Sequence, residues 1–363
     1  MLHGRRLAGF LILAVLVFPL LGLDLFGQDK DKKGEDKKPE AKKTEDKKAE
    51  DKKDTSKDPS KPTLAWKFEK GKTFYQTMKT NTTQTMKVMN NDVTQKQEQT
   101  FYFSWTPEEE KDGKWILEQK ILGVKMDIDI GGSPIKYDST SPAANNTSNP
   151  LSEFFKALVG ASFKVTLDPK TLTITNIEGR QKFVDNLVAA NKQMKPLLDK
   201  ILSEDALKEM AEPTFAVVTN EPVEKGKTWK KETKLDMGPI GTYKNEYTYK
   251  YDGKDEKSSL DKIDVDTKLT YVAPEKTDGI GGLPFKIKSA DLASKNAKGT
   301  VWFNRDKGRV DKTDMSLELG GKLQIEIGGQ PTQVELSQTQ KTTVETSDSN
   351  PVEAKPAPAA DKK

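Results

Sequence analysis

The sequence predicts an α+β protein with a mostly antiparallel β-sheet in two related halves and a central helical segment packed on the sheet. Three observations lead to this fold class. Apolar and polar residues alternate through most of residues 63–346, a pattern typical of half-buried antiparallel strands. Residues from about 150 to 212 instead repeat apolar side chains at helical spacing. The segment EKGKTF, at residues 69–74, recurs as EKGKTW at residues 224–229.

Two segments before this domain have compositions unlike a packed core. Residues 1–27 contain two arginines followed by an apolar run at 7–23, which predicts a cleaved signal peptide or a retained membrane anchor. Residues 28–62 repeat the unit EDKK and contain too few apolar side chains to offset the entropy of ordering, so we expect a disordered linker. The polar residues 347–363 predict a disordered tail.

The N-terminal apolar run leads us to expect export to the periplasm or the extracellular space, or anchoring to the cytoplasmic membrane through residues 7–23.

The first half, about residues 63–178, is predicted to begin with three long strands. Residues 73–89 and 98–106 have strand patterns, and Asp112-Gly113 is a strong hairpin signal. The third strand, residues 121–130, places alternate side chains on two faces. Its apolar face contains Val124, Met126, Ile128 and Ile130, and its polar face contains Lys125, Asp127 and Asp129.

Helices are predicted at about 150–160 and 179–212. Between them, residues 162–177 return to a strand pattern that folds back on itself near Asp168. The last helix is expected to end at Pro213, because proline cannot continue a helix.

The second half, about residues 213–346, repeats the order of the first. Its first strands place four tyrosines in phase, followed by an expected turn at Asp252-Gly253 and a strand at 260–272. Its later features match those of the first half: Gly281-Gly282 with Pro284 corresponds to Gly131-Gly132 with Pro134, and a hairpin at 299–313 corresponds to one at 160–174. We interpret this order as an internal duplication, with a period far above the 20–50 residues of solenoid repeats.

The repeated Gly-Lys-Thr also ends the phosphate-binding P-loop. That motif needs a further glycine five residues earlier and a helix afterwards. Trp66 and Glu221 occupy the required positions, and a strand pattern follows each segment. We therefore predict two turns in which Gly71 and Gly226 adopt positive φ.

No catalytic, cofactor-binding or metal-binding residue is predicted. Cysteine is absent and the single histidine, His3, lies in the N-terminal segment, so the domain has no residues for Ser-His-Asp or Cys-His catalysis or for a usual zinc site. Asn304–Gly308 has fragments of a calcium loop but too few acidic residues, and predicts a hairpin turn. Asp127 and Asp129, about 7 Å apart on one strand face, leave a carboxylate-based hydrolase as an alternative. Alternating surface charge explains these two residues more simply, and we predict that the protein is not an enzyme.

A formal net charge of +4 predicts no basic face for nucleic acid. The aromatic residues at 101–105 and 243–251 and four methionines predict a sheet core or the lining of an apolar cavity, because curved sheets covered by helices often enclose ligands. These methionines are Met78, Met86, Met89 and Met126. We expect an apolar or lipid-like ligand or an envelope protein as partner. A structural role in the envelope is a further alternative.

Four segments resemble a family of secreted bacterial domains of unknown function. They are WKFEKGKTF at 66–74, IKYDST at 135–140, FKVTLDPKTLTITNIEG at 163–179 and EPVEKGKTW at 221–229. The resemblance implies export and one β-rich architecture over about residues 64–345, and no catalytic residues. At the level of fold alone, long strands with covering helices are similar to bacterial envelope lipoprotein carriers.

Overall fold

A computed structural model describes residues 61–89, 91–141, 150–275 and 285–353 of the protein. The predicted signal segment, most of the linker and Gly281-Gly282 lie outside these residues, as does the end of the C-terminal tail.

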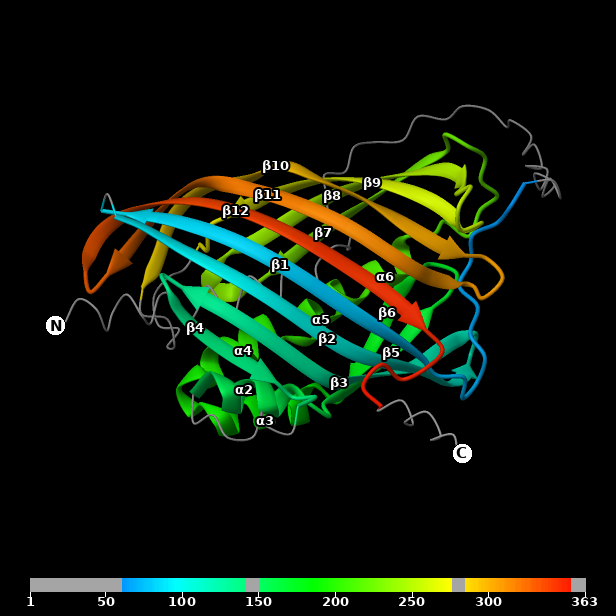
Figure 1. Cartoon of the computed structure of the whole chain (residues 1–363), viewed down its shortest axis with the longest axis horizontal. Coiled ribbons are helices and arrows are strands. Elements are labelled where there is room, and N and C mark those ends of the chain that lie inside the picture. Colours follow the sequence, from blue (N-terminus) through cyan, green and yellow to red (C-terminus); the bar gives the residue numbers. More distant parts are fainter. Residues whose placement is uncertain (1–60, 90, 142–149, 276–284, 354–363) are drawn as a thin grey trace, which may run out of the picture.

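The described strands form one antiparallel sheet (Figure 1). They are β1 (Phe74–Val88), β2 (Asn91–Lys111), β3 (Lys114–Ile130), β4 (Ser133–Asp138), β5 (Ser162–Asp168), β6 (Thr173–Glu178), β7 (Thr228–Asp236), β8 (Thr242–Lys254), β9 (Asp261–Val272), β10 (Lys286–Asn304), β11 (Arg309–Ile327) and β12 (Gln330–Ser347).

The chain enters this sheet at its centre rather than at an edge. The strand order is β6-β5-β3-β2-β1-β12-β11-β10-β9-β8-β7, and β4 pairs with β3 outside this path. The chain therefore runs from β1 outward to the edge strand β6, crosses to the opposite edge at β7, and returns through successive strands to β12. There β12 pairs with β1 along nearly its whole length, from Tyr75 opposite Ser347 to Val88 opposite Val334.

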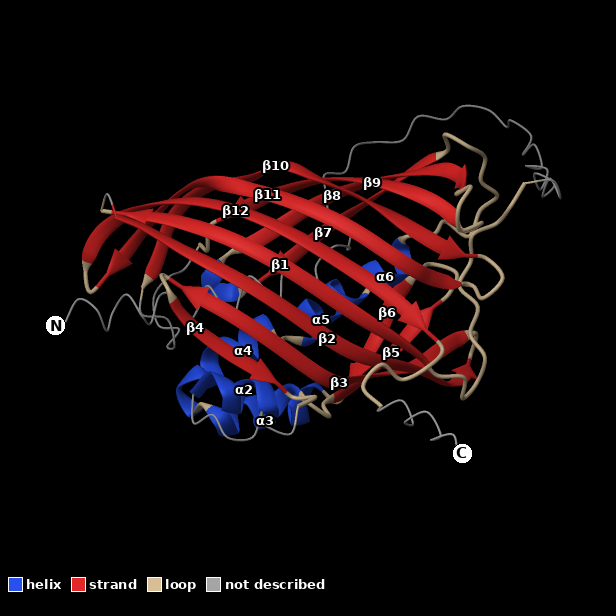
Figure 2. Cartoon of the chain, viewed as in Figure 1, coloured by secondary structure: helices blue, strands red, loops and turns tan. Residues whose placement is uncertain are grey.

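The helices lie on the concave side of the curved sheet (Figure 2). They are α2 (Pro150–Leu158), α3 (Arg180–Ala190), α4 (Lys195–Ile201), α5 (Glu204–Ala211) and α6 (Pro213–Ala216), with single 3-10 turns η2 (Lys192–Met194) and η3 (Gly238–Ile240). Ser203 caps α5 by accepting a hydrogen bond from the Ala206 amide (3.2 Å). α5 ends at Ala211, before Pro213, where the last helix was predicted to end. The chain then forms a further short helix, α6, which Pro213 begins and where its missing N–H removes no helical hydrogen bond.

Both EKGKT segments form the predicted turns. Gly71 and Gly226 have φ of 76° and 92°. Gly71 precedes β1 and donates its N–H to the Pro107 carbonyl of β2 (2.7 Å), and Gly226 precedes β7 and donates its N–H to the Tyr251 carbonyl of β8 (2.8 Å). The strands that follow differ in position, because β1 lies at the centre of the sheet and β7 at an edge.

One predicted turn is wrong. Asp252-Gly253 lies within β8, where Gly253 forms a bulge opposite β9, and the strand continues to Lys254. The chain turns at residues 255–260 because the Asp255 carboxylate accepts hydrogen bonds from the Ser258 amide (2.9 Å) and hydroxyl (2.7 Å). This side-chain bonding favours a turn as much as glycine does. The hairpin at Asp112-Gly113 and the turn at Asn304–Gly308 form as predicted.

The concave face of the sheet is the hydrophobic core. The four tyrosines of β8 point into it and are at most 4% exposed, and Val124, Met126 and Ile128 are buried as the alternation predicts. Met89, expected in the core or a cavity, is 71% exposed. It lies at the β1–β2 turn with φ of 49°, beyond the part of the sheet that the helices cover.

Candidate functional site

The sequence-predicted carboxylates do not meet in a cleft. The Asp127 carboxylate pairs with the Lys136 ammonium (2.5 Å) of neighbouring β4, and Asp129 accepts a hydrogen bond from the Gly132 amide (2.7 Å). Both residues are on the face of β3 opposite Met126 and Ile128. Their carboxylates therefore stabilise a surface strand pair and a turn.

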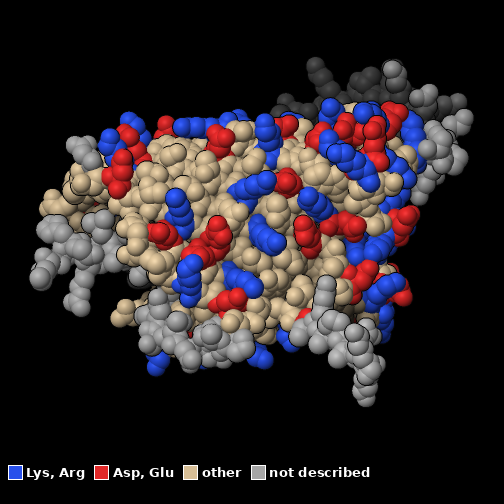
Figure 3. All heavy atoms as spheres, viewed as in Figure 1, with Lys and Arg blue, Asp and Glu red and all other residues tan. Residues whose placement is uncertain are grey.

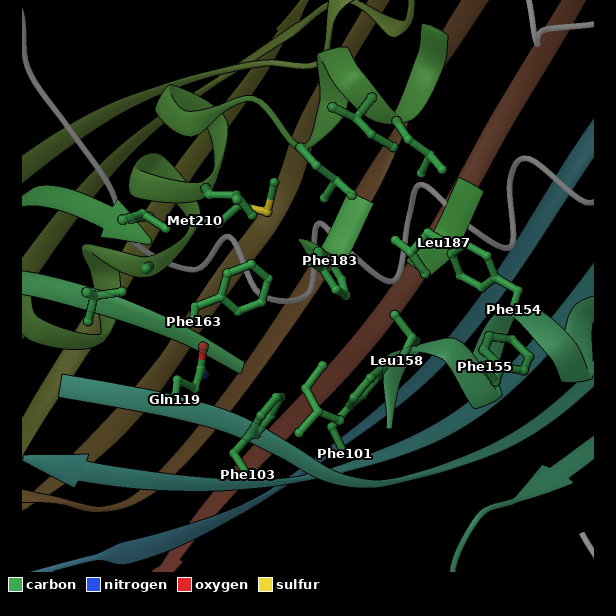
Figure 4. Close-up of a pocket in the computed structure, with 18 of the residues that line it drawn as sticks. Phe101, Phe103, Gln119, Phe154, Phe155, Leu158, Phe163, Phe183, Leu187 and Met210 are labelled. Atoms are coloured by element: carbon green, nitrogen blue, oxygen red, sulfur yellow. The ribbon is translucent and has the colours of Figure 1, made fainter. Parts of the chain in front are cut away.

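An apolar cavity lies between the sheet and the helices (Figure 4). The cavity volume is about 170 Å³. This is smaller than the several hundred Å³ expected for a ligand groove, because apolar side chains of the helices fill much of the space beneath the sheet.

The sheet wall of the cavity follows from the two-residue period of its strands. On β2, the inward positions are Gln99, Phe101, Phe103 and Trp105, and all four line the cavity. Strand rise places the first and last of these about 20 Å apart, so the cavity is elongated along β2. Neighbouring strands complete the wall with Gln119, Ile121 and Met126 of β3, Phe163 and Val165 of β5, and Ile177 of β6.

The helices supply the opposite wall. On α2, Phe154 and Leu158 are four residues apart and therefore share a helix face. Figure 4 shows Phe101 and Phe103 pointing from the sheet toward the helices. The remaining helical lining residues are Phe155, Phe183, Leu187, Met194, Leu197, Leu198, Ile201, Leu202, Leu207, Met210 and Ala211, with Thr214 on α6.

The lining contains no charged side chain. Its polar members are Gln99, Gln119 and Thr214. Gln119 is half-buried, whereas Gln99 is only 2% exposed. This lining favours an uncharged, largely apolar occupant, because an ion there would lose its hydration without gaining a counter-charge.

A buried carboxylate joins the two edges of the sheet beside the cavity. Glu212, between α5 and α6, is 5% exposed. Its Oε1 accepts a hydrogen bond from the Ile174 amide of β6 (2.8 Å), and its Oε2 lies 4.0 Å from the Lys231 ammonium of β7. Burial raises the pKa of Glu212, and the Ile174 hydrogen bond opposes that rise only in part. Glu212 therefore links both edge strands to the helices, at a cost in desolvation.

Sequence reasoning found the strand wall but missed the helical one. The aromatic run at 101–105 was an expected cavity lining, and Met126 also lines the cavity. Met78 and Met86 are buried in the core and do not line it. The residues missed on α2 had a readable signal, since Phe154, Phe155 and Leu158 give that helix a strongly apolar face.

Charged side chains are mixed over the convex face of the sheet. Figure 3 shows basic and acidic side chains interspersed on this face, and pairs such as Lys341–Asp314 (3.7 Å) and Lys322–Glu335 (3.5 Å) bridge adjacent strands. Within the described ranges, no cluster of three or more acidic or histidine side chains is placed to hold a metal ion. In the same part of the chain, no helix is both long and apolar enough to cross a membrane.

The described residues form a curved antiparallel sheet with an apolar cavity between the sheet and the helices. Residues 112–290, just under half of the chain, match a family described as "Family of unknown function (DUF6263)". The predicted resemblance to a family of unknown function is thereby confirmed for these residues. No curated protein matches the chain.

Solved structures give remote likenesses. A lipovitellin structure, titled for its lipid–protein interactions, is 11% identical with a TM-score of 0.41, over 80% of this chain and 26% of that chain. This protein therefore spans about a quarter of the lipovitellin chain. DynF from the dynemicin biosynthesis pathway of Micromonospora chersina is 9% identical (TM-score 0.18; 78% and 85% coverage). OccK7 (OpdD) of Pseudomonas aeruginosa is 7% identical (TM-score 0.19; 76% and 99% coverage).

Proposed function

We propose that the protein is an exported, non-enzymatic binding protein that holds an apolar or lipid-like molecule in the cavity between its sheet and its helices. The observation that carries the proposal is the cavity, whose lining has no charged side chain. Export rests on the apolar N-terminal segment and the charged linker.

The energetics of an empty cavity support this function. Protein interiors are normally close-packed, so the side chains that line an unfilled space lose dispersion contacts. This cavity leaves about 170 Å³ unfilled and is partly open to solvent, so its cost lies below that of a sealed core void of the same size. A ligand that fills the space recovers part of this cost, so occupancy stabilises the fold.

The two alternative functions have less support from the structure than ligand binding in the cavity. The carboxylate-based hydrolase requires two acidic side chains in one cleft, and the cavity lining contains none. A role limited to partner binding would be indicated by an exposed apolar patch or a bare sheet edge. In the described part of the chain, the exposed large apolar side chains are Met89 and Val272, which lie at the ends of different strands and form no patch. The sheet does end in two edge strands, β6 and β7, so this role stays an alternative.

Native mass spectrometry tests the proposal directly. Protein purified from its own cell envelope should carry a bound molecule of lipid-like mass. Ala211→Phe places a ring in the cavity, since Ala211 is a small lining residue, and should lose this mass. Ala189→Phe makes the same change on an exposed position of α3 and should retain it.

Two results would contradict the proposed function. One is wild-type protein that carries no bound molecule and takes up no uncharged apolar fluorophore such as N-phenyl-1-naphthylamine. The other is equal loading of the two alanine variants.

We further propose that the two halves, β1–β6 and β7–β12, descend from one duplicated unit. The similar turn geometry at Gly71 and Gly226 and the successive pairing of strands after each turn support this origin. Sequences of the family aligned over each half separately should show matching glycine positions. Unrelated patterns in the two halves would contradict it.

A further inference from the structure

A row of buried amides lies on the concave face of β2 and continues toward the cavity. Gln95, Gln97 and Gln99 are each at most 3% exposed. Gln95 Nε2 donates to Gln97 Oε1 (3.3 Å), and Gln97 Nε2 donates to Gln99 Oε1 (3.1 Å). The row therefore ends at Gln99, the one member that lines the cavity.

Gln99 Nε2 has no hydrogen-bond partner among the described residues. Its cross-strand neighbours make no such bond. Met126 on β3 has only a weakly accepting thioether, and the Thr80 hydroxyl on β1 pairs with Thr342 (3.1 Å) rather than with Gln99. A buried donor left unpaired costs about 1–3 kcal/mol, so a polar atom that meets Gln99 Nε2 from the cavity recovers that cost.

The other unpaired amide atoms of this face have complementary neighbours. Gln84 Nε2 is an unpaired donor, and Gln95 Oε1 and Gln338 Oε1 are unpaired acceptors. Gln84 lies directly opposite both residues in the sheet, so a small adjustment or a bridging water satisfies all three. Gln99 is the only one of these glutamines among the cavity-lining residues, and its buried Nε2 needs only a small rotation of the side chain to meet a polar atom there.

We propose that the ligand of the cavity is an uncharged amphipath whose polar oxygen accepts a hydrogen bond from Gln99 Nε2. This inference rests on the proposed function and adds the chemical class of the ligand. Phe101, Phe103 and Trp105 continue along β2 from Gln99, so the apolar part of the ligand lies along them. An ester, ketone, amide or alcohol oxygen fits this site. An ionised carboxylate does not, because the lining offers no cation.

The test measures displacement of N-phenyl-1-naphthylamine from the full chain by three eight-carbon competitors. They are octane, octan-2-one and octanoate, which share a chain length and differ in polarity and charge. Wild-type protein should bind octan-2-one at least about tenfold more tightly than octanoate at pH 7.5, given the cost of burying an unpaired charge. Gln99→Met should weaken octan-2-one binding by about fivefold, the value of one neutral hydrogen bond, and leave octane binding unchanged.

Gln340→Met is the matched control. Gln340 belongs to a similar buried row on β12, where its Nε2 donates to Thr342 (3.4 Å), and it does not line the cavity. It should leave the affinities for all three competitors unchanged. Urea unfolding of each variant, checked without ligand, separates a binding effect from a folding one.

The possible failures are distinguishable. The assignment of Gln99 is overturned if Gln99→Met binds octan-2-one as tightly as the wild type does. It is also overturned if the wild type binds octanoate as tightly as octan-2-one. In both cases, binding of octane still supports the proposed function. Wild-type protein in which neither octane nor the ketone displaces the fluorophore overturns the proposed function itself.

Discussion

Removing the Glu212 side chain should loosen the contact between the two sheet edges and the helices. Glu212 accepts the Ile174 amide hydrogen bond and faces Lys231 on the opposite edge, and α5 packs against both β6 and β7. In Glu212→Ala the Ile174 N–H is left buried without its acceptor. That loss costs about 1–3 kcal/mol, so we expect the free energy of unfolding to fall by this amount at pH 7.

Glu212→Gln separates the hydrogen bond from the charge. The glutamine amide oxygen still accepts from Ile174, while the desolvated negative charge is removed. The pKa of Glu212 is raised by burial, so in the pH interval above its ordinary value the folded state binds more protons than the unfolded state. The stability that protonated Glu212 contributes is therefore fully present below the ordinary glutamate pKa of about 4.3. It is lost as pH rises through the higher folded-state pKa.

Urea unfolding of wild type, Glu212→Ala and Glu212→Gln between pH 4 and pH 8 measures both effects. The stability of the wild type relative to Glu212→Gln should fall as pH rises, because other titrating groups cancel in the difference. A wild-type-minus-glutamine difference that stays flat or rises with pH would refute the assigned pKa direction. A Glu212→Ala variant within about 0.5 kcal/mol of wild type would refute the structural role, since changes of that size are usual for surface positions.

Two further substitutions test other parts of the core. Tyr251→Phe removes a hydrogen bond from the Tyr251 hydroxyl to the buried Asp261 carboxylate (2.7 Å). It should lower the free energy of unfolding in urea by about 1.5–3 kcal/mol. Burial raises the pKa of Tyr251 to about 12, so the absorbance difference between wild type and Tyr251→Phe should show no phenolate at pH 10. Gly321→Ala should destabilise the protein by more than about 1 kcal/mol, because Gly321 has φ of 151° and its added methyl group would collide with the Asp291 carbonyl. Gly329→Ala, at φ of 83° with open space around it, should cost less when both glycine variants are compared by urea unfolding. Equal losses would contradict the assigned collision.

The sequence was a good guide to the sheet wall of the candidate site and a poor guide to its helical wall. Alternation along β2 identifies Phe101, Phe103 and Trp105 as residues of one face, and all three line the cavity. The residues facing them, such as Phe183 and Leu198, come from helices far along the chain. Periodicity shows that these side chains are buried, but it does not show which strand they face.

Gln99 illustrates the same limit for a polar side chain. In the sequence it is one of several glutamines that alternate with charged and polar residues in β2, and nothing there marks it as buried. In the structure, Gln99 lies at the end of an amide row, and its neighbours across the sheet are Thr80 on β1 and Met126 on β3. A free hydrogen-bond donor arises only from that combination of neighbours.

The sequence by itself determined the strands, most turns and the EKGKT turns, because these depend on local backbone preferences and on a two-residue period. Only the tertiary structure decided that β1 lies at the centre of the sheet beside β12, and that the helices cross between the edge strands β6 and β7. Strand order is set by pairings between distant segments, whose free energy does not appear in any short stretch of sequence. The cavity exists for the same reason: it is the space left where an alternating strand face and an apolar helix face, each readable alone, meet without filling each other.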